Sequence, residues 1–208
     1  MAEARPLREL ALLEIAAVIA AAVAPLPERL PAVVPLLVAA MLSRALRRRG
    51  WTEVMHGDAT HALVGAAAGL AALAIALVVG TPALEAALDR AIEWSRFAIV
   101  RGSGSQLVAV VVYVAMIAVA AELVLRGWLV ERVLEFAPAQ RVLAVLVGAI
   151  AEAALESGTA TARLGAFAFG LGLGWIYVAG NRSVVAPVCA RVAFQVAAVM
   201  LEATRVIG

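Results

Sequence analysis

The sequence predicts an all-α integral membrane protein, a polytopic bundle of about seven transmembrane helices with one further helix lying at the membrane surface. Hydrophobic residues make up 64% of the 208-residue chain, whereas a soluble domain is about half apolar. Only 5% of the residues are aromatic, and there are 16 glycines among many alanines, valines and leucines. This composition is typical of membrane helices that pack closely against one another.

Apolar stretches of about 17–25 residues are long enough to cross a bilayer as helices. Seven candidates follow one another along the chain, at residues 8–25, 30–46, 59–80, 105–133, 140–157, 161–180 and 183–203. The first is the weakest, because Glu9 and Glu14 lie in its early turns. These acidic residues, and the spans that follow, favour a retained membrane anchor over a cleaved signal peptide.

The arginines predict how the helices are oriented. The densest basic cluster, SRALRRRGW at 43–51, follows the second span directly, and the positive-inside rule places it and the N-terminus in the cytoplasm. The same orientation puts three later basic residues inside: Arg132, Arg141 and Arg182. All 17 basic residues are arginine, which indicates high-GC coding. We therefore expect a bacterial protein of the inner (cytoplasmic) membrane.

The segment 81–100 has the pattern of an amphipathic helix lying in the membrane interface. Pro82 suits the first turn of a helix, acidic residues lie largely opposite the apolar ones, and Trp94 suits headgroup depth. A flexible joint follows at 101–106. We expect one compact membrane domain with two regions. Residues 1–104 hold the N-terminal helices, the basic loop and the interfacial helix, and residues 105–208 form a four-helix core.

A glycine-rich stretch lies within the sixth span. Its glycines are Gly165, Gly170, Gly172 and Gly174. A dinucleotide-binding loop would need a preceding strand and a βαβ unit, and the sequence predicts neither. Close packing of helices is the better interpretation, with Gly170 and Gly174 four residues apart on one face.

Several ionisable residues fall inside the predicted spans, where they are costly and mark functional or structural sites. Glu122 and Arg126 are four residues apart on one helical face, with the acid before the base. Glu152 lies in the fifth span. Arg191 and Gln195 share a face of the last span in the same way.

Two stretches that contain these residues resemble a known family. AELVLRGWL, at 121–129, is similar to the first motif of the CPBP family, the CAAX-protease and bacteriocin-processing (Abi) intramembrane metalloproteases, which reads Glu-Glu-x-x-x-Arg followed by Gly, an aromatic residue and Leu. FAFGLGLGWIYVAGNRSVVAPVCARVAFQ, at 167–195, resembles the end region of the same family. The resemblance covers about residues 105–200 and implies a CPBP-like helical core in the C-terminal half.

The departures from the family pattern fall on its catalytic positions. The resemblance implies that active members use the first glutamate of the first motif, a histidine in a middle Phe-x-x-x-His motif, and a final histidine and asparagine. The corresponding residues here are Ala121, Ala153 (or Glu152 if the register slips by one), Arg191 and Gln195. Glu122 and Arg126 match the second glutamate and the arginine of the first motif.

These replacements predict a degenerate member with no catalytic residues, no metal and no cofactor. An arginine supplies a permanent cation instead of a metal ligand, and Ala121 cannot act as a general base. Glu122 and Arg126 are then a structural ion pair. We expect Arg191 to replace the positive charge of the metal by pairing with Glu152 or Glu122, because an unpaired buried arginine would be costly.

The sequence therefore favours a non-catalytic scaffold or accessory subunit, whose partners are the lipid bilayer and other membrane proteins. The net charge of +2 gives no support to nucleic-acid binding. The alternative is an active or altered CPBP-type intramembrane protease, in which Glu122, Glu152 and Glu156 could form another acid/base set. A transporter comes third, together with a subunit that binds a hydrophobic ligand or a pigment. In the pigment case His56 and His61 could ligate a tetrapyrrole, although such edge histidines are usually solvated.

Overall fold

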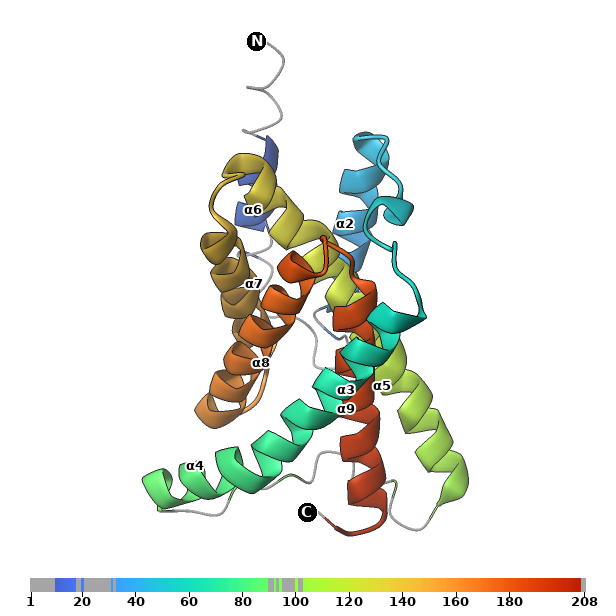
Figure 1. Ribbon diagram of the computed structural model, residues 1–208, viewed down its shortest axis with the longest axis vertical. Coiled ribbons are helices and arrows are strands. Elements are labelled where there is room, and N and C mark those ends of the chain that lie inside the picture. Colours follow the sequence, from blue (N-terminus) through green and yellow to red (C-terminus); the bar gives the residue numbers. More distant parts are fainter. Residues whose placement is uncertain are drawn as a thin grey trace. The chain divides into compact units, whose positions relative to one another are not determined.

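Figure 1 shows a computed structural model of the chain and the helices that it forms. It describes residues 10–17, 20, 31, 33–89, 92, 94, 100 and 103–206. Over these residues it contains helices and no strand, so the predicted all-α class is confirmed. The α-helices are α2 (Val33–Leu46), α3 (Ala59–Ile75), α4 (Thr81–Leu88), α5 (Gly104–Val124), α6 (Glu131–Phe136), α7 (Arg141–Leu155), α8 (Ala160–Ala179) and α9 (Val185–Ala203). Residues 10–17 are also helical.

Four helical stretches of the described chain are long and apolar enough to cross a membrane. They are Ala59–Leu88, Gly104–Phe136, Ala160–Ala179 and Val185–Ala203. Each coincides with one of the predicted spans that begin at residues 59, 105, 161 and 183. The chain is thus an integral membrane protein, as its composition predicted.

Two other predicted spans correspond to shorter helices. α2, predicted as a span over 30–46, has 14 residues, and α7, predicted over 140–157, has 15. A spanning helix needs about 20 residues, and both helices are shorter than that over the described residues, so these two spans stay predictions. α2 begins after Pro31, and α7 ends where Glu156 turns to an extended conformation. Most of the predicted first span, 8–25, lies outside the described residues.

The predicted interfacial helix does not begin as a separate element at Pro82. α3 and α4 form one continuous helix, joined by a π-helical turn, η2 (Ala76–Gly80). A proline removes one backbone donor and crowds the preceding turn, and a widened turn accommodates this defect. Thr81 supports the turn, because its Oγ1 donates to the Ala76 carbonyl at 2.9 Å.

The combined helix ends well before residue 100. Asp89 has a φ of +47°, a left-handed conformation that stops a helix, and Ile92 and Trp94 are not helical. The Trp94 indole instead donates to Thr81 Oγ1 at 3.0 Å. The other residues of the predicted 81–100 helix beyond Asp89 lie outside the described residues.

A second π-helical turn, η4 (Leu125–Val130), joins α5 to α6 and keeps them one continuous helix of 33 residues, Gly104–Phe136. At 1.5 Å per residue this helix is about 50 Å long, whereas the hydrocarbon core of a bilayer is about 30 Å thick. Every residue of η4 is buried. π turns of this kind are frequent at functional sites.

Contacts divide the chain into two compact units, Met1–Gly57 with Ala120–Pro187, and Asp58–Val119 with Val188–Gly208. In the second unit α3 and α9 approach so closely that a Cβ added at Gly69 would lie 2.0 Å from the Ala190 carbonyl oxygen. α5 packs there through Val114, which clusters with Val199 and Val100. The predicted regions 1–104 and 105–208 stay a prediction.

The N-terminus of α3 carries a titratable cap. Asp58 accepts a hydrogen bond from the His61 backbone N–H at 3.0 Å, and its contacts with His61 lower the pKa of the Asp58 carboxyl. A carboxyl with a lowered pKa stabilises the folded state above its unfolded pKa of about 3.9, and this contribution is lost as pH falls through the folded pKa.

In the wild type the His61 amide should therefore lose protection from hydrogen exchange at acid pH, so that its exchange rate rises relative to the intrinsic rate at the same pH. Asp58→Ala should show fast exchange at every pH. The Thr159 cap of α8 is a matched control, because its hydroxyl accepts from the Ala162 N–H at 3.2 Å and does not titrate. Equal pH dependence at His61 and Ala162 would contradict the role of Asp58.

Candidate functional site

A buried group of charged side chains lies in the first unit, where η4 meets α7 and α8. The Arg126 guanidinium donates from Nη1 to Glu122 Oε1 at 3.1 Å and from Nη2 to Glu152 Oε2 at 2.7 Å. Nη2 also donates to the Gly170 carbonyl oxygen at 2.8 Å. We call Glu122, Arg126 and Glu152 the buried triad.

The triad is sealed from solvent. Glu122 and Arg126 are fully buried, and Glu152 is 6% exposed. Removing charges from water costs several kcal/mol each, and pairing with good hydrogen-bond geometry offsets that cost. Arg126 therefore serves as the counter-charge of both carboxyl groups and ties three helical segments together.

Glycines on α8 make room for the triad. α7 and α8 run side by side (Figure 1). A Cβ added at Gly170 would lie 2.8 Å from Glu152 Oε2 and 3.0 Å from the Ala149 Cα, and one at Gly174 would lie 2.9 Å from Val145 Cγ1. A Cβ at Gly165 or Gly172 would meet no described atom within 4 Å. Close packing on this helix thus rests on Gly170 and Gly174.

We expect Gly170→Ala to lower the free energy of unfolding by about 1–3 kcal/mol, because the added methyl group overpacks the α7–α8 contact. Gly172→Ala, on the same helix but in open space, should be neutral or stabilising by up to about 1 kcal/mol, because alanine favours helix. Denaturant unfolding in mixed micelles measures both variants. A loss at Gly172 as large as at Gly170 would contradict this assignment.

A second, larger network of charges lies at the end of α2 and contacts α6. Arg47 donates to Glu14 and Glu135, both at 2.8 Å, and Arg132 and Arg49 also bond to Glu135. We call these residues, together with Arg44, the arginine cluster. Arg44 donates to the Gly127 carbonyl at 3.0 Å and stacks 4.7 Å from the centre of the Trp51 ring.

Hydroxyl and indole groups extend this network into the core. Ser43 Oγ donates to Glu14 at 2.6 Å and accepts from the Trp128 indole at 3.0 Å. On α8, the buried Tyr177 donates its hydroxyl to Glu131 at 2.8 Å. The hydroxyl and indole groups of Ser43, Trp128 and Tyr177 thus each have a hydrogen-bond partner inside the protein.

One comparison with known proteins identifies the part of the chain that holds the triad. Residues 103–197 match the family model described as Rce1-like, type II CAAX prenyl endopeptidase. This segment is similar to the Rce1-like family. The resemblance to CPBP proteases that the two motifs indicated is thereby confirmed. No curated protein and no solved structure matches the chain.

Two of the expected catalytic positions of the Rce1-like segment, Ala121 and Ala153, carry no ligand atom. The carboxyl groups of Glu122 and Glu152 are both bonded to Arg126. Over the described residues no three His, Cys, Asp or Glu side chains come together as metal ligands. The absence of a metal stays a prediction.

The two remaining family positions lie on α9. Arg191 is 8% exposed, and Gln195 is half-buried. Both belong to the second contact unit, whereas the triad belongs to the first. The predicted pairing of Arg191 with Glu152 or Glu122 therefore stays a prediction.

The two histidines engage groups of their own chain. The ring nitrogens of His56 lie 3.0 Å from the Glu53 carbonyl oxygen and 3.1 Å from that of Asn181. His61 Nδ1 lies 2.7 Å from Asp58 Oδ1. These contacts make His56 a tie between the loop after α2 and the turn between α8 and α9.

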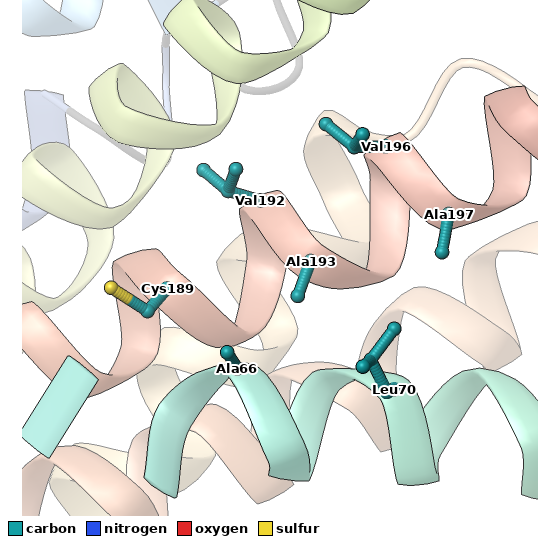
Figure 2. A pocket seen from close by; sticks show the side chains of 7 residues that line it. All are labelled: Ala66, Leu70, Cys189, Val192, Ala193, Val196 and Ala197. Atoms are coloured by element: carbon teal, nitrogen blue, oxygen red, sulfur yellow. The ribbon is translucent and has the colours of Figure 1, made fainter. Parts of the chain in front are cut away.

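An apolar groove runs between α3 and α9 in the second unit (Figure 2). Its volume is about 420 Å³, and its lining side chains are all apolar or sulfur-bearing: Ala66, Leu70, Cys189, Val192, Ala193, Val196 and Ala197. It offers no acid, base or polar ligand, so it contributes no chemistry to the candidate site.

Sequence reasoning missed most of the arginine cluster. The density of arginine at 44–49 marked the loop, but Glu14 was interpreted only within the first span, as its weakness and as an argument against a signal peptide. In the structure Glu14 is the partner of Ser43 and Arg47, 29 and 33 residues away. The sequence did hold a signal for this contact: an acidic residue in one predicted span and an arginine-rich loop after the next. Such charges are rarely buried unless they are paired.

Proposed function

We propose that this protein is a non-catalytic member of the Rce1-like family that acts as a scaffold or accessory subunit of a membrane protein complex. The observation that carries the proposal is the position of Arg126. Its guanidinium binds both core carboxyl groups, at 3.1 and 2.7 Å, where a hydrolase would need a carboxylate free to activate water. The proposal places the protein in a bacterial cytoplasmic membrane, with the arginine cluster on the cytoplasmic side.

Two further observations support the absence of catalysis. Ala121 stands where the family has its first glutamate, so the general base is missing. Glu156, the third acid of an altered hydrolase, stands at the C-terminal end of α7 and accepts from the Gly158 N–H in its own turn, at 3.2 Å. It therefore serves local structure.

A hydrolysis assay tests the negative half of the proposal. Purified full-length protein is incubated with a prenylated peptide that ends in a CAAX sequence, with and without added Zn²⁺ or Mn²⁺. We expect no cleavage above the background of a mock purification. Cleavage that disappears in Glu122→Gln or Glu152→Gln, but persists in the control Glu53→Gln, would overturn the proposal, provided that the inactive variants remain folded.

Isolation from native membranes in mild detergent tests the positive half. A scaffold should co-purify with the same membrane proteins in fixed stoichiometry from one preparation to the next. Recovery of the chain only as a monomer or homodimer would contradict a role as a subunit.

A further inference from the structure

At the C-terminal end of α2, an apolar stripe on the helix is followed directly by exposed arginines. Val38, Leu42 and Leu46 follow at intervals of four residues, so they lie on one face of the helix. They are 52%, 60% and 83% exposed. In a membrane protein such a stripe can face lipid, because the acyl chains of lipids are as apolar as leucine side chains.

The chain turns sharply where this stripe ends. Arg48 has a φ of +53°, and the Arg49 N–H donates to the Arg44 carbonyl at 2.9 Å. The turn closes the helix and leaves Arg48 and Arg49 exposed; the Arg49 side chain is 42% exposed. Both guanidinium groups therefore reach the surface directly beyond Leu46.

The charge around these two arginines is positive. Glu14 and Glu135 are shared among Arg47, Arg49 and Arg132. Among the described residues, Arg44 has Glu53, at 3.5 Å, as its acidic contact. With Arg48, five arginines of this part of the chain stand against three glutamates. Nη2 of the buried Arg132 has no hydrogen-bond partner among the described residues, so the glutamates do not saturate the cluster.

The length of the helix that carries part of the cluster favours a position of the cluster at the depth of the lipid headgroups. α6 carries Arg132 and Glu135 at the end of the helix that is about 50 Å long, beyond the roughly 30 Å that a hydrocarbon core can cover. Basic residues directly after a membrane helix attract anionic lipids at about 1 kcal/mol each.

We propose that α2 and the turn after it bind one anionic phospholipid. Its phosphate is held by Arg48 and Arg49, and one acyl chain lies along Val38, Leu42 and Leu46. The positive excess selects the anionic headgroup, and the adjoining stripe selects a lipid over a soluble anion. This inference goes beyond the proposed scaffold function and does not depend on it.

Native mass spectrometry of the full chain in mild detergent tests the proposal. The protein is titrated with palmitoyl-oleoyl phosphatidylglycerol and with the phosphatidylcholine of the same acyl chains, and bound lipids are counted. We expect one phosphatidylglycerol to bind at least about tenfold more tightly. Arg48→Gln with Arg49→Gln should weaken that binding about 30-fold, from about 1 kcal/mol per arginine.

A matched control removes the same charge elsewhere. Arg163 and Arg205 are exposed and distant in sequence from α2, and their double change to glutamine should alter binding by less than about threefold. Arg49 also contacts Glu135, so the single variant Arg48→Gln, which keeps this pair, should still weaken binding about fivefold.

Three results would overturn the proposal. They are equal affinity for the two lipids, an equal loss in the control variant, and displacement of the lipid by inorganic phosphate at comparable concentration, which would indicate a soluble-anion site. If another protein stays bound to this surface after full delipidation, and added lipid does not change its binding, the surface is a site for a protein partner instead.

Discussion

Arg126→Met is expected to lower the free energy of unfolding by about 3–5 kcal/mol. The change removes the guanidinium that binds Glu122 and Glu152, and with it one hydrogen-bonded positive charge from each of two buried carboxyl groups. Breaking a buried ion pair from one side costs this much because the desolvation of the remaining charge is no longer offset by that bond. Denaturant unfolding in mixed detergent micelles, followed by tryptophan fluorescence, measures the loss.

Two controls separate charge from packing in this experiment. Arg163→Met changes an exposed arginine and should stay within about 0.5 kcal/mol of the wild type. Replacing the whole triad, with Glu122→Leu, Arg126→Met and Glu152→Leu together, should recover most of the lost stability, because no charge of the triad remains. A triple variant as unstable as Arg126→Met alone would mean that the triad acts through shape.

Gly69→Ala is expected to destabilise the second unit by about 3 kcal/mol, the upper end of the usual cost of overpacking. The added Cβ would lie 2.0, 2.7 and 2.9 Å from the carbonyl oxygen, carbonyl carbon and Cα of Ala190. These are backbone atoms, so no side chain can rotate to relieve the clash. α3 and α9 would have to separate.

The same unfolding measurement tests this prediction against Gly165→Ala. A Cβ at Gly165 meets no described atom within 4 Å, so that variant should keep or slightly raise the stability of the wild type. Wild-type stability in Gly69→Ala would show that α3 and α9 do not cross as closely as the structure indicates.

The buried triad shows where sequence reasoning reached its limit. Glu122 and Arg126 are four residues apart, and helical geometry alone places them on one face. Glu152 binds the same guanidinium from α7, 26 residues beyond Arg126. Spacing within one helix cannot reveal that contact, because it depends on how α7 and α8 pack against η4.

The glycines and the interfacial helix illustrate the same limit. Gly170 and Gly172 look alike in sequence, but only Gly170 faces α7. Pro82 suits two positions equally well, the start of a new helix and the first turn after a π-helical bulge. The structure contains the bulge. In both cases neighbours that are distant in sequence select one of two locally acceptable conformations.

By itself the sequence determined the all-α membrane class, the places of four spanning helices among the seven that it predicted, the Rce1-like segment and the local pair of Glu122 with Arg126. Each follows from composition, from helical periodicity or from a motif of consecutive residues. Only the tertiary structure decided that Arg126 serves both Glu122 and Glu152, that Glu14 is held by Ser43 and Arg47, and which glycines allow close packing. The physical reason is that a buried charge is compensated by whichever group the fold brings within about 3 Å of it. In the same way, the space beside a glycine is filled by whichever neighbour the fold places there. In both cases packing between helices decides which group this is.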